Sequence, residues 1–181
     1  MKVVISHYYG ITNNEDGSIP WYLKTSPDIQ FFKQQTLDTD IIMGSKTFDL
    51  LGRLPNRKTI VVSKNKDKYK NEVVTTNQLL FVENACLIGG KEIIKSYVSS
   101  KVLNPTNCIF YLTEYRFIEN TKYIDNSSCN FDGKLFPFLN PIANVFSSQF
   151  IHPKLGLCMF DVNMYDLKEP ETDKIEFDFS T

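Results

Sequence analysis

Short apolar runs alternate with amphipathic segments along most of the chain. Apolar runs of this length, bounded by glycine, proline or polar residues, are typical of buried strands, whereas apolar side chains that recur every three or four residues indicate a helix. The pattern predicts strands at residues 2–8, 40–44, 59–63, 73–76, 86–89, 108–113 and 156–167, with another within 143–150. It predicts helices at residues 28–36, 46–51, 77–81 and 90–99.

The order of these elements predicts an α/β fold. Strands and helices alternate through residue 113, which implies a central, mostly parallel sheet with helices on both faces and hence three layers. The last strands suit an antiparallel C-terminal hairpin, which makes the sheet mixed. We expect one domain over residues 1–168, followed by an acidic C-terminal tail over residues 169–181.

Composition and charge exclude several classes of protein. A net charge of −1 argues against a nucleic-acid binder, because such proteins carry a strong excess of basic residues. No apolar run is long enough to span a membrane and the N-terminus enters a strand directly, so we expect a soluble, cytoplasmic protein without a membrane partner. The four cysteines lack C-x-x-C spacing and the two histidines are isolated, which predicts reduced thiols and no metal site.

The first candidate for chemistry is the turn that follows the strand at 40–44. Gly44 allows the chain to reverse tightly, and the helix that follows opens with Ser45, Lys46 and Thr47. Ser45 and Thr47 can cap this helix, while its exposed N–H groups and Lys46 suit a phosphate group. Such turns are common in α/β proteins, so a purely structural turn is the alternative reading.

A second turn repeats this arrangement. Gly89 and Gly90 lie between an apolar strand and a helix that opens with Lys91. Paired glycines let the backbone pack closely against a ligand, and two phosphate-binding turns fit one diphosphate. An ordinary glycine turn is the alternative, because Lys91 stands where a fuller motif has a third glycine.

The third candidate supplies acid–base chemistry. Pro20 and Trp21 precede a loop, and Asp28 follows in the first turn of a helix that carries Ile29 and Phe32 near one face. A carboxylate at this position can simply favour the helix dipole, or it can lie in an apolar cleft and deliver a proton.

Together, the three elements resemble dihydrofolate reductase in their order and spacing, over roughly residues 1–167. The resemblance implies the three-layer fold of that family and NADPH-dependent reduction of dihydrofolate to tetrahydrofolate, with hydride transfer to C6 and protonation at N5. It implies that Asp28 binds the pterin ring and assists its protonation. It also implies that Trp21 helps to hold a water molecule near the pterin and that Thr113 hydrogen-bonds the acid.

The substrate residues follow from the same resemblance. Arg57 matches the arginine that grips the glutamate carboxylate of the substrate, a task suited to its two-pronged donor geometry. The other positions that match substrate contacts are Ile5, Ile29, Phe32, Leu51 and Ile88.

The cofactor residues lie on the two turns and the strands beside them. The positions that match NADPH contacts are Ser6, Ile19, Gly44, Ser45, Lys46, Thr47, Ser63, Lys64, Gly89, Gly90, Lys91, Glu92 and Ile93. In the family the bond at Gly89–Gly90 is cis and abuts the cofactor. Lys46 and Lys64 could favour NADPH over NADH by contacting the extra phosphate. However, Ser45 and Glu92 stand where many members of the family carry a basic residue.

The expected partners are dihydrofolate and antifolates such as methotrexate, bound by a monomer. Two other readings share the fold: an NADPH reductase of the riboflavin pathway type, and a reductase-derived structural or ligand-binding protein without turnover. The combination of Trp21, Asp28 and Arg57 favours folate reduction over both.

Overall fold

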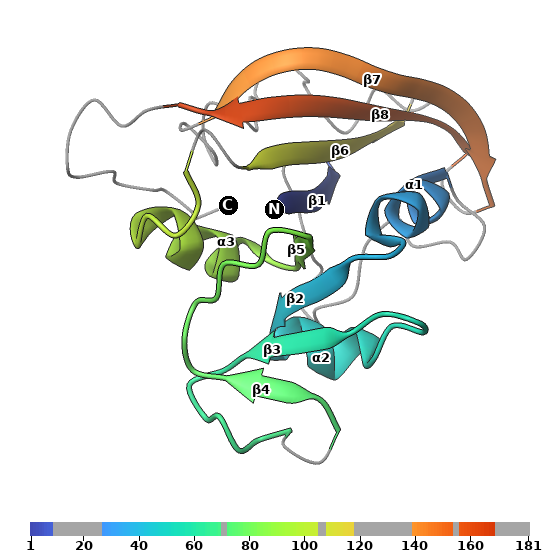
Figure 1. Ribbon diagram of the computed structural model, residues 1–181. Helices are drawn as coiled ribbons and strands as arrows, with labels where there is room; N and C mark the ends of the chain where they lie inside the picture. Colours follow the sequence, from blue (N-terminus) through green and yellow to red (C-terminus); the bar gives the residue numbers. More distant parts are fainter. Residues whose placement is uncertain (9–26, 70–71, 105–107, 118–138, 154–155, 169–181) are drawn as a thin grey trace.

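The computed structural model describes residues 1–8, 27–69, 72–104, 108–117, 139–153 and 156–168 (Figure 1). Its helices are α1 (Pro27–Thr36), α2 (Ser45–Leu51) and α3 (Lys91–Ser99). Its strands are β1 (Lys2–Tyr8), β2 (Asp40–Gly44), β3 (Thr59–Val62), β4 (Val74–Thr76), β5 (Ala85–Ile88), β6 (Ile109–Phe117), β7 (Leu139–His152) and β8 (Gly156–Leu167).

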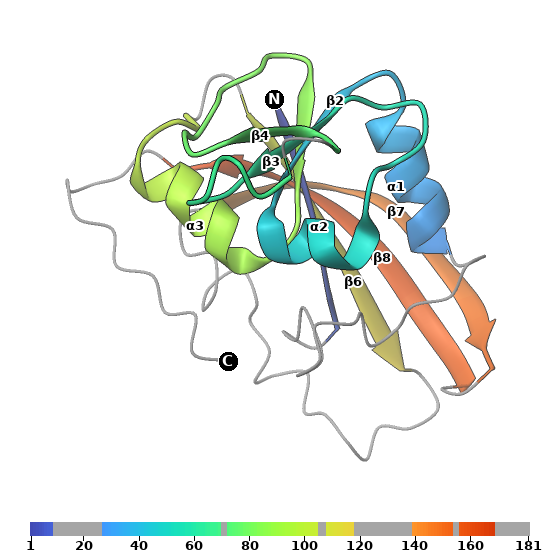
Figure 2. The same ribbon diagram turned by 90° about the horizontal axis from the view of Figure 1, so that it is seen from below.

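The strands form one mixed sheet, which confirms the predicted class. Their order is β4-β3-β2-β5-β1-β6-β8-β7, and the strands from β4 to β6 pair in parallel. Strand β8 runs antiparallel to β6, and β7 runs antiparallel to β8 at the edge of the sheet. Figure 2 shows these three long strands side by side. Strand β5 returns to the middle of the sheet between β2 and β1, and this return places its carboxyl end beside that of β2.

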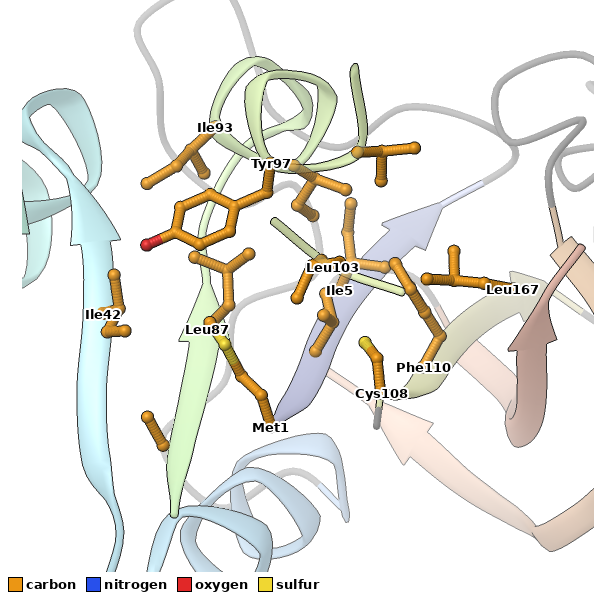
Figure 3. Close-up of a cluster of buried hydrophobic side chains, with 14 of the residues drawn as sticks. Met1, Ile5, Ile42, Leu87, Ile93, Tyr97, Leu103, Cys108, Phe110 and Leu167 are labelled. Atoms are coloured by element: carbon orange, nitrogen blue, oxygen red, sulfur yellow. The ribbon is translucent and has the colours of Figure 1, made fainter. Parts of the chain in front are cut away.

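Helices cover both faces of the sheet. Helix α3 packs on one face, where Tyr97 and Ile93 lie against Leu87 of β5 and Ile42 of β2 (Figure 3). Helices α1 and α2 lie on the other face, where Phe48 packs with a cluster drawn from strands β1, β2, β3 and β5. Strands β2 and β5 are therefore buried on both faces, which explains their uninterrupted apolar runs.

The predicted helix at residues 77–81 is wrong. Residues 77–78 form a bend and 79–82 have no regular structure. The backbone N–H of Gln78 donates to Thr76 Oγ1 at 3.1 Å, a local turn that competes with a helix. Leu79, Leu80 and Val82 pack against the α3 side of the core, so their apolar spacing reflects packing of an extended connection.

The remaining elements match their predicted ranges with small shifts, except at the C-terminal hairpin. Strand β7 spans Leu139–His152, well beyond the predicted 143–150, and β6 extends to Phe117. None of the described helices has the length and apolar character needed to cross a membrane. The predicted tail at 169–181 lies outside the described residues.

Candidate active site

The two glycine turns meet at the carboxyl ends of neighbouring parallel strands. Strands β2 and β5 pair from Asp40–Ala85 to Ile42–Leu87, and each leads directly into a helix. Gly44 is the N-cap of α2 and Gly90 is the N-cap of α3, and neither helix has a side-chain cap hydrogen bond. The prediction that Ser45 or Thr47 caps α2 is therefore wrong, because the capping position falls on a glycine. The first N–H groups of both helices therefore donate no hydrogen bond to the side chain of their N-cap residue.

The two turns also touch each other. A Cβ atom at Gly89 would lie 2.7 Å from Thr47 Oγ1, and one at Gly44 would lie 3.8 Å from Cβ and Cδ1 of Ile93. Thr47 of α2 thus lies against the second turn, and Ile93 of α3 lies against the first. This reciprocal packing fixes the relative position of the two helix N-termini.

The chain reverses at Gly89 through its backbone torsion. Gly89 has φ of +124°, a conformation that side chains rarely adopt. The described residues contain no cis peptide bond, so the Gly89–Gly90 bond is trans. This differs from the cis bond that the family resemblance implied, and the positive φ of Gly89 makes the turn instead.

A third parallel strand extends this edge of the sheet. Val62 of β3 pairs with Gly44, so Ser63 leaves β3 beside the first turn. The Ser63 N–H donates to the Thr76 carbonyl at 2.9 Å, and its Oγ accepts from the Asn65 N–H at 3.3 Å. The side chains of three further predicted cofactor residues are exposed near these helix and strand ends: Lys46, Lys64 and Glu92.

Helix α1 holds Asp28 over the opposite half of the sheet. Asp28 lies in the first turn and is partly buried. One turn further along, Phe31 meets the Tyr111 ring of β6 edge-on, with centroids 5.6 Å apart, and packs against Phe160 of β8. Phe32 packs instead into the cluster around Phe48 of α2. Two adjacent aromatic rings therefore anchor the helix that carries the candidate acid.

Thr113 lies in the middle of the sheet. It pairs with Ser6 of β1 and Val162 of β8, and its side chain is 1% exposed. Its Oγ1 donates to the Ile5 carbonyl at 3.4 Å. The Ile5 side chain packs on the α3 face, whereas Ile88 packs on the face of α1 and α2. The two side chains therefore face opposite sides of the sheet.

Arg57 connects the end of α1 to the loop before β3. Its Nε donates to the Thr36 carbonyl at 3.1 Å and its Nη1 donates to the Pro55 carbonyl at 2.9 Å. A guanidinium group has five N–H donors, so the remaining ones can hold a carboxylate. Leu51, at the end of α2, is 42% exposed.

A separate hollow of about 710 Å³ opens beside β3 and β4. Both basic and acidic side chains line it, together with threonines and valines: Arg53, Lys58, Thr59, Lys66, Asp67, Glu72, Val73, Val74 and Thr75. None of the predicted catalytic residues is in this lining, so the hollow does not mark the candidate active site.

Several predicted residues cannot be placed in this site. Trp21 and Ile19 lie outside the described residues, as do the side chains of Ser6 and Lys91. Among the side chains that the structure describes, no group of three or more His, Cys, Asp or Glu could hold a metal ion. Among the described residues, Cys86, Cys108 and Cys158 are buried and form no disulfide bond.

Comparisons with known proteins identify the family. The family model for dihydrofolate reductase matches residues 7–106. A dihydrofolate reductase from Buchnera aphidicola subsp. Schizaphis graminum is 32% identical over 149 residues, which cover 73% of this chain and 86% of that protein. The chain belongs to the dihydrofolate reductase family.

Two further members of the family show how far the similarity extends. The enzyme from Haemophilus influenzae is 35% identical over 94 residues. The match covers 46% of this chain and 56% of that enzyme, little more than half of its length. A solved dihydrofolate reductase from Enterococcus faecalis, complexed with NADP(H) and RAB-propyl, has the same fold with a TM-score of 0.60. It is 22% identical, and the alignment covers 93% of this chain and 96% of that one.

The contact between Phe31 and Tyr111 was not predicted, although the sequence held a signal for part of it. Phe31 lies three residues after Asp28, a spacing that places both side chains on one face of a helix. Nothing in the local pattern indicated that Tyr111, eighty residues later on β6, would be its partner.

Proposed function

We propose that this chain catalyses the reduction of 7,8-dihydrofolate to 5,6,7,8-tetrahydrofolate with NADPH. The observation that carries the proposal is the interlocked pair of turns, in which Thr47 fills the space beside Gly89 and Ile93 lies beside Gly44. In a member of this family, two uncapped helix N-termini at adjacent strand ends suit the diphosphate of a dinucleotide.

The residues at this edge fit NADPH. The N–H groups after Gly44 and Gly90 would hold the diphosphate, because the glycine at each N-cap has no side chain to accept from them. Ser63 and the exposed Lys46 and Lys64 would contact the adenosine half and its extra phosphate. When bound, the cofactor supplies the hydride that reduces C6 of the substrate.

The substrate residues would act from α1 and the loop before β3. Asp28 would accept hydrogen bonds from the pterin amino group and ring N–H, and it would assist delivery of a proton to N5 through water. Phe32 and Ile88 would pack against the pterin, while Arg57 would bind the glutamate carboxylate. Holding the substrate in a reactive orientation is the main contribution that these residues make.

Antifolates would compete for the same residues, since they carry a similar ring. The cytoplasmic location and the monomeric state expected from the sequence remain predictions. Purified protein analysed by size-exclusion chromatography, with and without NADPH, would test the monomeric state.

The direct test is the loss of NADPH absorbance with and without dihydrofolate, for the wild type and Asp28→Asn. We expect folate-dependent oxidation by the wild type. We expect Asp28→Asn to lower kcat by at least about 100-fold, the contribution of a positioned acid, while binding of dihydrofolate changes by less than about tenfold.

Asp38→Asn is the matched control, because it makes the same chemical change two residues beyond the end of α1. Asp38 is exposed and has φ of +57°, which asparagine also tolerates, so its activity should equal that of the wild type. Wild-type turnover by Asp28→Asn would remove Asp28 from the mechanism. Absence of folate-dependent oxidation in the wild type would reject the proposed reaction.

A further inference from the structure

Tyr69 joins the segment after β3 to helix α2. The segment of residues 63–69, here called the β3 strap, starts beside Gly44 and ends at Tyr69. Tyr69 is only 7% exposed, and its ring meets Phe48 of α2 edge-on with centroids 4.7 Å apart. The strap is therefore attached to α2 through a buried aromatic contact as well as to the sheet through Ser63.

The hydroxyl group of Tyr69 adds polar contacts to the same helix. It donates a short hydrogen bond to Asp49 Oδ1, and the Ser45 carbonyl lies 3.4 Å from the same hydroxyl. A phenol has a single proton, so the shorter contact to Asp49 is the principal one. Ser45 is the first residue of α2, directly after the first phosphate turn.

Lys68 completes this cluster. Its Nζ lies 3.5 Å from Asp49 Oδ2 and 5.0 Å from the centre of the Tyr69 ring. The hydrogen bond from Tyr69, followed by the charge of Lys68, lowers the pKa of Asp49. Asp49 is thus a charged acceptor at neutral pH, and a hydrogen bond to a charged group is stronger than one between neutral groups.

The cluster of Tyr69, Asp49 and Lys68 lies between two groups of expected cofactor contacts. One end of the β3 strap carries Ser63 and Lys64, the expected contacts for the adenosine half of the cofactor. The other end is held by Tyr69 to the helix whose N-terminus would bind the diphosphate. The cluster therefore sets the position of one group of cofactor contacts relative to the other.

We propose that Tyr69 and Asp49 are positioning residues for NADPH, which fix the β3 strap against α2. This inference rests on the proposed function. Neither residue has to touch the cofactor; each acts through Ser63 and Lys64. Loss of the hydrogen bond should weaken binding of the adenosine half and leave the pterin site unchanged.

Tyr69→Phe tests the inference, because it keeps the ring and removes the hydroxyl. We expect KM for NADPH to rise by about two- to tenfold, the effect of one lost hydrogen bond. At saturating NADPH, kcat and KM for dihydrofolate should stay within twofold of the wild type. The preference for NADPH over NADH should fall, because the strap carries the lysine expected at the extra phosphate.

Tyr97→Phe is the matched control for removal of a buried tyrosine hydroxyl. Tyr97 is fully buried on the opposite face of the sheet, and its hydroxyl donates to the Leu80 carbonyl at 2.7 Å. This variant should lose stability without a change in the ratio of the KM values for NADPH and NADH. The same loss of NADPH preference in both variants would overturn the inference in favour of general destabilisation.

Variants of the acceptor separate its charge from its hydrogen bond. Asp49→Ala removes the acceptor and should raise KM for NADPH as much as Tyr69→Phe does. Asp49→Asn keeps an acceptor oxygen and should lie closer to the wild type. The double variant Tyr69→Phe/Asp49→Ala should be no worse than either single variant, since both remove one interaction. Additive effects would contradict the proposed pairing.

The outcomes also separate this inference from the proposed function. A wild type that oxidises no NADPH in the presence of dihydrofolate rejects the function, and the inference fails with it. A wild type that turns over, beside a Tyr69→Phe variant with unchanged KM for NADPH, rejects the inference alone.

Discussion

At the scale of single residues, Gly89 is the most constrained position of the candidate site. Its φ of +124° disfavours any side chain, and a Cβ atom would lie 2.7 Å from Thr47 Oγ1. Gly90 differs on both counts, because its φ is −78° and no atom would lie within 4 Å of an added Cβ. Adjacent glycines in one motif thus serve different purposes.

This difference predicts unequal effects of alanine at the two glycines. Gly89→Ala should lower the free energy of unfolding by about 1–3 kcal/mol, because it combines backbone strain with a close contact. Gly90→Ala should lower it by less than about 1 kcal/mol, the cost of alanine at an N-cap. Urea unfolding of both variants measures the two free energies of unfolding. Equal decreases would show that a side chain at Gly89 causes no additional strain.

At the scale of an element, the C-terminus of α1 depends on distant residues. The Thr36 carbonyl accepts from Arg57 Nε at 3.1 Å, from Thr39 Oγ1 at 3.0 Å and from the Thr39 N–H at 3.3 Å. The carboxyl end of a helix dipole favours a nearby cation. Arg57 therefore holds the helix that carries Asp28, in addition to its proposed contact with the substrate.

This double role predicts the behaviour of two substitutions. Arg57→Ala should raise KM for dihydrofolate by about 10- to 100-fold, because charge-assisted hydrogen bonds are lost, and should also destabilise the end of α1. Arg57→Lys keeps the charge without the planar fork and should recover only part of the loss. Steady-state kinetics and thermal unfolding measure the two effects.

Lys58→Ala provides the control for loss of a positive charge at the adjacent position, where the side chain is exposed. Its KM for dihydrofolate should equal that of the wild type. An unchanged KM in Arg57→Ala would instead place the carboxylate site elsewhere.

Elements were predictable from the sequence where burial is strong. The limits of β1, β2 and β8 agree with the predicted ranges. In β2 the apolar run ends at Gly44, which marks the end of the strand. Strand β7 was underestimated because it is an edge strand with mostly exposed residues. Its side-chain contacts are partly polar, as in the 2.6 Å hydrogen bond from Ser147 to Asp161, and partly apolar, as in the edge-on contact of Phe146 with Phe160. Two register shifts against β8 interrupt its two-residue period.

Some features of the candidate site were likewise predictable from the sequence, and others were not. The two glycine turns were predictable because a short apolar run and a glycine mark each of them locally. The roles of Asp28 and Arg57 were inferred from the family resemblance and stay predictions. Tyr69 was not predictable, because it lies in a lysine-rich segment and its acceptor is twenty residues away in the sequence. The trans bond at Gly89–Gly90 was missed because the expectation of a cis bond came from the family and not from this chain.

At the scale of the whole molecule, burial on both sides of the sheet raises the pKa of three groups. Burial raises the pKa of the Cys86 and Cys108 thiols from an ordinary 9.0 to about 12, and that of the Tyr97 phenol from 10.0 to about 12. Cys86 lies on β5 and Tyr97 on α3, and both are fully buried. Each group keeps its proton in the folded state because ionisation would place a charge in an apolar environment.

These shifts predict that stability falls in alkaline solution. Below about pH 9 the groups are protonated in both states, so they do not change stability with pH. Between about pH 9 and 12 the unfolded chain loses protons that the folded chain retains, so each group lowers the free energy of unfolding by up to about 1.4 kcal/mol per pH unit. Urea unfolding at a series of pH values from 8 to 11 should show this decline.

A substitution of one group identifies the source of the decline. Cys86→Val keeps an apolar side chain of similar size in β5 and removes one of the titrating groups, so the slope against pH should become shallower by about one group's share. The same slope in wild type and variant would assign the decline to other groups. A wild type whose free energy of unfolding does not change up to pH 11 would mean that water reaches these side chains. The sheet, buried on both faces, could not then be the rigid support on which the cofactor and substrate residues are held.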